Sequence, residues 1–111
     1  VEGDERLLSR VLRNLADNAA RHARNRVAIG VAPVGGGVEL SVDDDGGGIP
    51  EQDRARVFER FVRLDEARTR DAGGSGLGLS IVAEIVRAHS GTIRVETGPA
   101  GGARFVVHLP A

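Results

Sequence analysis

The sequence has no cysteine, no lysine and no long apolar run, and these absences exclude several classes of protein. Without cysteine there are no disulfide bonds and no thiolate metal sites. No apolar stretch approaches the roughly 18 residues that span a bilayer, so we expect this chain not to enter a membrane. The polar start at Val1–Arg6 predicts no signal peptide. The net charge of −1 predicts no general attraction to nucleic acid.

The length of 111 residues suits a single domain, 1–111, with a core of its own. Its first part predicts a long helix from an N-cap at Asp4 to about Arg24. The predicted inward positions of this helix recur at helical spacing and are Leu8, Leu12, Leu15, Ala19 and Ala23. Two stretches rich in β-branched residues, 26–34 and 38–44, flank three glycines, Gly35-Gly36-Gly37, which predicts a β-hairpin.

The second half of the chain continues this mixture of helices and strands. Pro50 is expected to open a short helix reaching about Phe61 or Arg63, and the charged residues 64–75 predict a loop. A second amphipathic helix is predicted to end at Gly91, with Leu79, Val82, Ile85 and Val86 facing inward. Two final strands are predicted at Thr92–Thr97 and Ala103–Leu109. This order predicts an α+β two-layer sandwich, with helices on one face of a mixed, mainly antiparallel sheet.

The first helix carries a polar group of residues beside its apolar stripe: Asn14, Asn18, Arg21 and His22. At about 100° per residue they fall within roughly a third of the helix circumference. An asparagine oxygen is a neutral hard ligand for Mg²⁺, and an arginine neutralises phosphate oxygens. The group therefore suits a site for phosphate and metal. A helix with solvated polar residues beside its buried face remains the alternative.

A second motif, Asp44-Asp45-Gly46-Gly47-Gly48-Ile49, stands at the end of a predicted strand. A carboxylate there can accept a hydrogen bond from an exocyclic amine such as that of adenine. The glycines that follow allow a planar base to approach the backbone, because they have no Cβ. An acidic turn is the alternative. A calcium loop is excluded because the required ligand spacing is missing.

A third motif, Gly73-Gly74-Ser75-Gly76-Leu77-Gly78, leads into the second long helix. Exposed amides at a glycine-rich helix start bind anions, assisted by the helix dipole. The motif matches neither the Rossmann fingerprint nor the Walker loop, which needs a lysine. A glycine-rich hinge without a ligand is the alternative. The three histidines, His22, His89 and His108, show no metal-ligand spacing.

Four motifs in this order resemble the N, G1, F and G2 boxes of sensor histidine kinases, which belong to the Bergerat-fold ATPases. They are Asn14…Asn18, Asp44-x-Gly46-x-Gly48, Phe58-x-x-Phe61 and Gly74-x-Gly76-x-Gly78. The resemblance extends over nearly the whole chain, from 4 to 110. Two departures are Gly47, which stands where the family commonly has proline, and Ser90, which stands where it commonly has glycine.

The resemblance implies a site for ATP and Mg²⁺, with Asn18 as the metal ligand and Asn14 supporting metal or phosphates. Asp44 would bind the adenine amine, Arg21 would meet phosphate, and 63–74 would form an ATP lid. The implied nucleotide-binding set is Asn14, Asn18, Arg21, His22, Asp44, Gly46, Gly48, Ile49, Phe61, Gly74, Ser75, Gly76, Leu77 and Gly78. Relatives that hydrolyse ATP carry a glutamate at the position of Asn14. Because an amide is not a general base, we expect negligible hydrolysis here.

The resemblance also implies partners. Sensor histidine kinases transfer the γ-phosphoryl group to a histidine on a dimerisation and phosphoacceptor domain, whose His-Glu motif is absent from this chain. We therefore expect a monomeric catalytic fragment that does not autophosphorylate alone. Its parent would be a homodimer anchored in the bacterial inner membrane, with this domain on the cytoplasmic face, serving a response regulator. An anti-sigma-factor-type serine kinase and a non-enzymatic ATP-binding interaction module stay open as alternatives.

Overall fold

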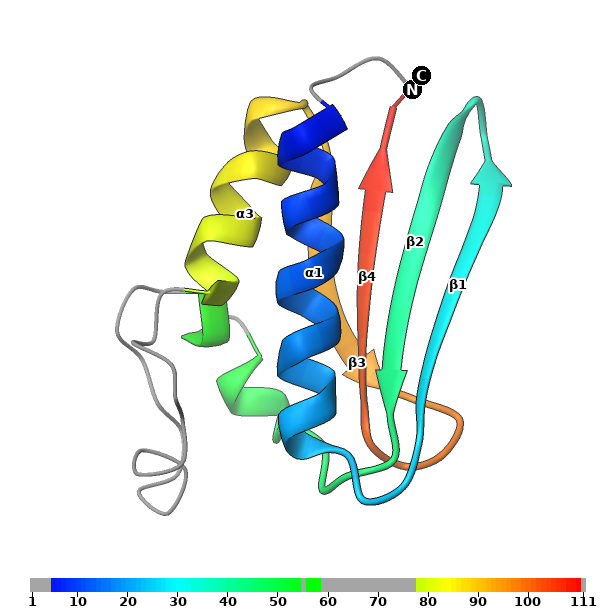
Figure 1. The fold of residues 1–111 in the computed structure, drawn as a ribbon, viewed down its shortest axis with the longest axis vertical. Helices are drawn as coiled ribbons and strands as arrows, with labels where there is room; N and C mark the ends of the chain where they lie inside the picture. Colours follow the sequence, from blue (N-terminus) through cyan, green and yellow to red (C-terminus); the bar gives the residue numbers. More distant parts are fainter. Residues whose placement is uncertain (1–4, 55, 59–77, 111) are drawn as a thin grey trace.

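Two helices lie side by side on one face of a four-stranded sheet (Figure 1). The computed structural model describes residues 5–54, 56–58 and 78–110. The helices are α1 (Glu5–His22) and α3 (Gly78–Ala88), the strands are β1 (Val27–Val34), β2 (Gly37–Asp44), β3 (Thr92–Thr97) and β4 (Ala103–Leu109), and the short 3-10 helices are η1 (Glu51–Asp53) and η2 (Arg56–Phe58). This arrangement confirms the predicted α+β sandwich.

The strand order is β1-β2-β4-β3, and every neighbouring pair among the described strands is antiparallel. The sheet was expected to be mixed, but these residues contain no parallel pair. The central pair joins β2 to β4, so Asp43 lies opposite Arg104 and Val42 lies opposite Phe105. The last residues of β2 therefore meet the first residues of β4, although about 60 residues separate them in the chain.

The hairpin between β1 and β2 turns on two glycines. Gly35 and Gly36 have φ of 52° and 89°, a left-handed backbone that glycine adopts without strain. Gly37, predicted as part of the turn, instead begins β2. A Cβ at this position would overlap the carbonyl oxygen of Leu109 on β4, so the third glycine permits close strand packing.

The core lies between the helices and the inner face of the sheet. Its largest fully buried side chains are Phe105, Leu15, Val11, Val42, Val82, Val86 and Val107. Phe58 of η2 packs edge-on against Phe105, with ring centroids 6.1 Å apart and an interplanar angle of 86°. The side chain of Phe58 therefore packs against the core, while Phe61 lies outside the described residues.

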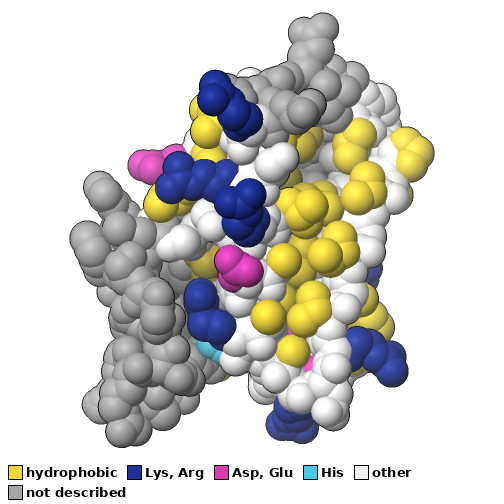
Figure 2. Space-filling model, in the orientation of Figure 1, with side chains coloured by type: hydrophobic (Ala, Val, Ile, Leu, Met, Phe, Trp, Pro, Cys, Tyr) yellow, Lys and Arg dark blue, Asp and Glu magenta, His cyan; other side chains and the backbone are white. Residues whose placement is uncertain are grey.

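One predicted core position of α1 is wrong. Leu12 is 36% exposed, whereas the neighbouring Val11 is only 1% exposed. The reason is tertiary, because α1 packs mainly against α3 and β2 and leaves the β1 side open. Ile29 and Val31 of β1 are 52% and 69% exposed on this side. Figure 2 shows the resulting band of apolar side chains beside α1.

Two helix ends differ from the expectation. α1 ends at His22 rather than Arg24. α3 ends at Ala88, and the left-handed residue that follows is Ser90, with φ of 62°, rather than Gly91. Ser90 N donates to the carbonyl of Arg87 and Gly91 N to that of Val86, both at 2.9 Å, which is a Schellman end. Gly91 serves another purpose, since a Cβ there would overlap the carbonyl oxygen of His108.

The predicted helix after Pro50 consists of η1 and η2 as far as Phe58. The predicted N-cap Asp4, the loop at 64–75 and the lid at 63–74 lie outside the described residues. Among the helices that the structure describes, none is long and apolar enough to cross a bilayer.

Candidate functional site

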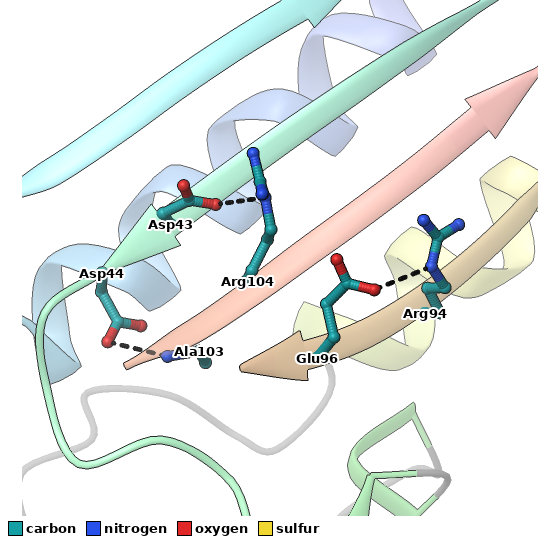
Figure 3. A network of polar contacts seen from close by, with 6 residues as sticks. All are labelled: Asp43, Asp44, Arg94, Glu96, Ala103 and Arg104. Carbon is teal, nitrogen blue, oxygen red and sulfur yellow. Dashed lines mark hydrogen bonds and ion pairs between the residues drawn. The ribbon is translucent and has the colours of Figure 1, made fainter. Parts of the chain in front are cut away.

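Asp44 ends β2 with its side chain buried, at 3% exposure. Its Oδ1 accepts hydrogen bonds from the backbone N–H groups of Gly46, at 2.8 Å, and Ala103, at 3.3 Å. Figure 3 shows the bond to Ala103 at the start of β4. No described residue donates to the other oxygen, Oδ2. Two backbone donors therefore hold the carboxylate, and one oxygen is left to accept a hydrogen bond from a ligand.

Asp43, the preceding residue, points to the opposite face of the sheet because side chains alternate along a strand. Its Oδ1 lies 3.1 Å from Nε of Arg104 on β4, and Figure 3 shows this ion pair apart from Asp44. The two neighbouring carboxylates thus have separate surroundings. Asp43 contacts a cation on the outer face, while Asp44 faces the helices.

Two glycines allow the backbone to close around Asp44. A Cβ on Gly46 would overlap the carbonyl oxygen of His22, so the loop after β2 touches the end of α1. A Cβ on Gly102 would overlap both the backbone oxygen and Oδ1 of Asp44. Gly46 was predicted as a site residue, and Gly102 was not. The sequence feature that could have indicated Gly102 is the glycine pair just before the last strand. That pair points to Asp44 only once β4 is known to pair with β2.

The structural role of Asp45 was also not predicted from the sequence. Its carboxylate accepts hydrogen bonds from the backbone N–H groups of Arg24 at 2.7 Å, Asn25 at 3.0 Å and Arg26 at 3.2 Å. These bonds, first of all the one from Asn25, lower the pKa of Asp45 below its ordinary value of 3.8. The ionised side chain fastens the α1–β1 loop to the end of β2.

The rest of this loop is held by contacts that the sequence did not predict. Gly48 has φ of 77°, and Ile49 packs against the core. The carbonyl oxygen of Ile49 accepts a hydrogen bond from Nε of Arg54 at 3.0 Å, and Nη2 of Arg54 donates to Oγ1 of Thr97 at 2.9 Å. Arg54 therefore links the glycine loop to the end of β3.

The two asparagines of α1 lie on the side of the helix that adjoins its buried face. Asn18 is 8% exposed and Asn14 is half-buried. No described residue hydrogen-bonds to the side-chain amide of Asn18. An amide that no described residue bonds to, on a side chain at the edge of the buried face, is available to a ligand. Its oxygen is of the type that Mg²⁺ accepts.

Of the remaining predicted site residues, some lie in the described part of the chain and some lie outside it. Arg21 is exposed on α1, and His22 is half-buried at its end. Gly78 begins α3, which packs against α1, and a Cβ there would meet nothing within 4 Å. Phe61, Gly74, Ser75, Gly76 and Leu77 lie outside the described residues. No three His, Asp or Glu side chains gather as metal ligands in the described parts of the chain.

The α1 end, the loop after β2 and the β3–β4 turn thus meet at Asp44, and the asparagines continue along α1 from that point. A family model described as "Histidine kinase-, DNA gyrase B-, and HSP90-like ATPase" matches residues 3–111. The chain belongs to this ATPase family. The antiparallel sheet with helices on one face is shared with the ATP binding domain of PrrB from Mycobacterium tuberculosis, with a TM-score of 0.78 at 35% identity over 98% of this chain and 70% of that structure.

Individual members of the ATPase family support the same assignment. The sensor histidine kinase CpxA of Escherichia coli strain K12 is 41% identical over 108 residues, which are 97% of this chain and 24% of CpxA. The mycobacterial sensor histidine kinase MprB superposes with a TM-score of 0.89 at 39% identity, covering 99% of this chain and 76% of that structure. Full-length ShkA, solved in complex with AMPPNP, has a TM-score of 0.83 at 34% identity, covering 97% of this chain and 22% of ShkA. The chain spans about a quarter of the length of the curated relatives it matches.

Proposed function

We propose that this chain is the catalytic domain of a sensor histidine kinase. It binds ATP with Mg²⁺ and donates the γ-phosphoryl group to a histidine on a separate dimerisation and phosphoacceptor domain. The relatives CpxA and MprB are named as sensor histidine kinases, and ShkA was solved with AMPPNP, which supports both the activity and the nucleotide.

The observation that carries the proposal is the convergence of two partly unpaired polar groups. No described residue donates a hydrogen bond to Oδ2 of Asp44, and no described residue is hydrogen-bonded to the side-chain amide of Asn18. The close approach of Gly46 to His22 brings the loop that follows Asp44 against the end of α1. An acceptor for a base and a ligand for a cation thus border the same part of the molecule.

Each group has a role that its chemistry supports. Oδ2 of Asp44 accepts a hydrogen bond from the exocyclic amine of adenine, while Gly46 and Gly48 allow the base to approach. Asn18 holds the metal, with Asn14 beside it, and Mg²⁺ supplies charge neutralisation for the phosphates. Arg21 and the amides at the start of α3 contact phosphate oxygens. Phe61 and the segment 74–77 belong to the same proposed site.

The proposed reaction is transfer to a protein and not hydrolysis. Phosphoryl transfer depends on positioning and on neutralising charge. Activation of water would need a general base, and Asn14, the residue one turn from Asn18, carries an amide that cannot accept a proton. ATP therefore stays intact until an acceptor histidine reaches the γ-phosphate. We infer that the parent is a homodimer held in the inner membrane, with this domain in the cytoplasm and a response regulator as its partner.

The test mixes this chain with labelled ATP, Mg²⁺ and a dimerisation and phosphoacceptor domain supplied in trans. We expect acid-labile, alkali-stable label on the acceptor domain, as a phosphohistidine requires, and no label on this chain. Asn18→Ala should abolish transfer, because the metal loses its side-chain ligand. Asn25→Ala is the matched control, since it removes an exposed amide whose side chain takes no part in the site.

Three results would contradict the proposal. Steady ATP hydrolysis by this chain alone would oppose the role of Asn14. Alkali-labile label on serine would favour the anti-sigma-factor-type kinase. Absence of Mg²⁺-dependent ATP binding would favour an interaction module without enzymatic activity.

A further inference from the structure

The surface of α1 opens into a hollow beyond Asn14, toward the N-terminal end of the helix. This arginine hollow has a volume of about 520 Å³ and is lined by Arg6, Ser9, Arg10, Arg13 and Asn14. Figure 2 shows basic side chains gathered over α1, next to the apolar band. Of the described residues that line it, Asn14 is the one that also belongs to the proposed nucleotide site.

Helix geometry places Arg10 in line with the asparagines. Arg10, Asn14 and Asn18 are spaced four residues apart, so they stack on nearly the same side of α1. With a rise of about 1.5 Å per residue, Arg10 lies roughly 6 Å beyond Asn14, which an arginine side chain can bridge.

The order of these groups along α1 sets the orientation that a bound nucleotide would have. Asp44, the proposed contact of the base, adjoins the His22 end of the helix through Gly46. Asn18 and Asn14, the proposed metal residues, come next, and Arg10 follows them. A nucleotide with its base at Asp44 and its metal at Asn18 therefore extends its terminal phosphate toward the arginine hollow. Arg21 lies on the other side of Asn18, nearer to the base.

Helix stability does not account for these arginines. Arg6, Arg10 and Arg13 stand in the first half of α1, where cations oppose the helix dipole, and they repel one another at spacings of three and four residues. No ion pair joins Arg10 or Arg13 to another residue in the described parts of the chain. A hollow with this charge fits an anionic ligand.

We propose that Arg10, with Arg13 beside it, contacts the terminal phosphate of bound ATP and makes the site distinguish ATP from ADP. This inference rests on the proposed function and adds a residue to its site. The planar guanidinium binds two phosphate oxygens at once, and ADP offers no group at that end. The contact would favour release of ADP after transfer and its replacement by ATP.

Titration calorimetry on this chain with Mg²⁺ tests the contact, because both nucleotides bind without an acceptor domain. Arg10→Ala should weaken ATP binding about tenfold, equivalent to about 1.4 kcal/mol, and change ADP binding less than about twofold. The ATP affinity of Arg10→Lys should lie between those of the wild type and Arg10→Ala, since lysine keeps the charge and loses the bidentate geometry. Arg87→Ala on α3 is the matched control, because it makes the same change in net charge at an exposed helical site and should leave both affinities unchanged.

The outcomes separate this inference from the proposed function. Equal losses of affinity for ATP and ADP, or no loss for either, would overturn the contact with the terminal phosphate but would not contradict the proposed function. Unchanged nucleotide affinities together with a raised KM for the acceptor domain would assign the hollow to an acidic protein surface, and that too overturns the contact. A wild-type chain that binds neither nucleotide would refute both proposals. Thermal unfolding of each variant verifies that the fold is retained.

Discussion

Asp44→Asn is the most direct test of the nucleotide site, because the structure predicts that it changes binding and leaves folding nearly intact. The amide keeps an oxygen that can accept the backbone bonds from Gly46 and Ala103. Its NH2 group then replaces Oδ2, so an acceptor for the adenine amine becomes a donor. Asp44→Ala would instead leave two backbone donors unpaired, at about 1–3 kcal/mol each, and would confuse folding with binding.

The expected loss of affinity follows from the strength of a hydrogen bond to a charged group. Such a bond contributes about 1.5–3 kcal/mol, and each 1.4 kcal/mol changes a dissociation constant tenfold. Asp44→Asn should therefore weaken ATP binding by roughly tenfold to a hundredfold. The lost interaction is with the base. Inosine triphosphate has a carbonyl in place of the amine, so the wild type should bind it more weakly than ATP, and Asp44→Asn should not.

Titration calorimetry with both nucleotides measures this effect, and Asp43→Asn is the matched control. Asp43 is the neighbouring residue, carries the same charge and faces Arg104 on the other side of the sheet. Its substitution should leave nucleotide binding unchanged. The reasoning is refuted if Asp44→Asn binds ATP as tightly as the wild type, or if the preference for ATP over inosine triphosphate survives.

Three further predictions concern the surroundings of the site and the end of α3. Gly102→Ala should weaken nucleotide binding and lower stability by about 1–3 kcal/mol, because its Cβ would overlap Asp44. Ser90→Gly should raise the free energy of unfolding by about 0.5–1 kcal/mol, since glycine adopts the left-handed φ of 62° without strain. Asp45 should stabilise the fold at neutral pH and cease to do so as the pH falls below 3.8, because its pKa is lowered in the folded state. The unfolded chain takes up this proton first, so stability falls with falling pH.

Urea unfolding and calorimetry measure these three effects. Gly47→Ala is the control for Gly102, because a Cβ there meets nothing within 4 Å, and its stability should change by less than about 0.5 kcal/mol. A lower unfolding midpoint for Ser90→Gly would contradict the strain argument. For Asp45, the wild type should exceed Asp45→Asn in stability at neutral pH, and the difference should shrink in acid. A difference that is independent of pH would exclude the carboxylate as its source.

The sequence predicted those features that depend on near neighbours in the chain. The bounds of β3 and β4 agree with the prediction because alternation and flanking glycines act within a few residues. The placement of Asn14 and Asn18 on one side of α1 follows from helical spacing alone. Asp44 at the end of β2 was likewise expected, because the glycines after it end the strand.

The missed features of the site and the core depend on contacts between distant parts of the chain. Gly102 adjoins Asp44 only because β4 pairs with β2, and Asp45 binds backbone groups some 20 residues away. Leu12 and Val11 both fit an inward-facing stripe, and the choice between them was made by where α1 lies on the sheet. No local pattern contains this information.

By itself, the sequence determined the kinds of chemistry available to this protein: a carboxylate, neutral amides and glycine backbone, without cysteine or lysine. It also determined the local elements that carry these groups, because period and turn chemistry act over a few residues. Tertiary structure alone decided which groups remain without partners. Among the described residues, donors reach Oδ1 of Asp44 and none reaches Oδ2, and the nearly buried Asn18 has no partner for its amide. Burial and pairing result from packing between remote segments, so only the folded chain defines where a ligand can bind.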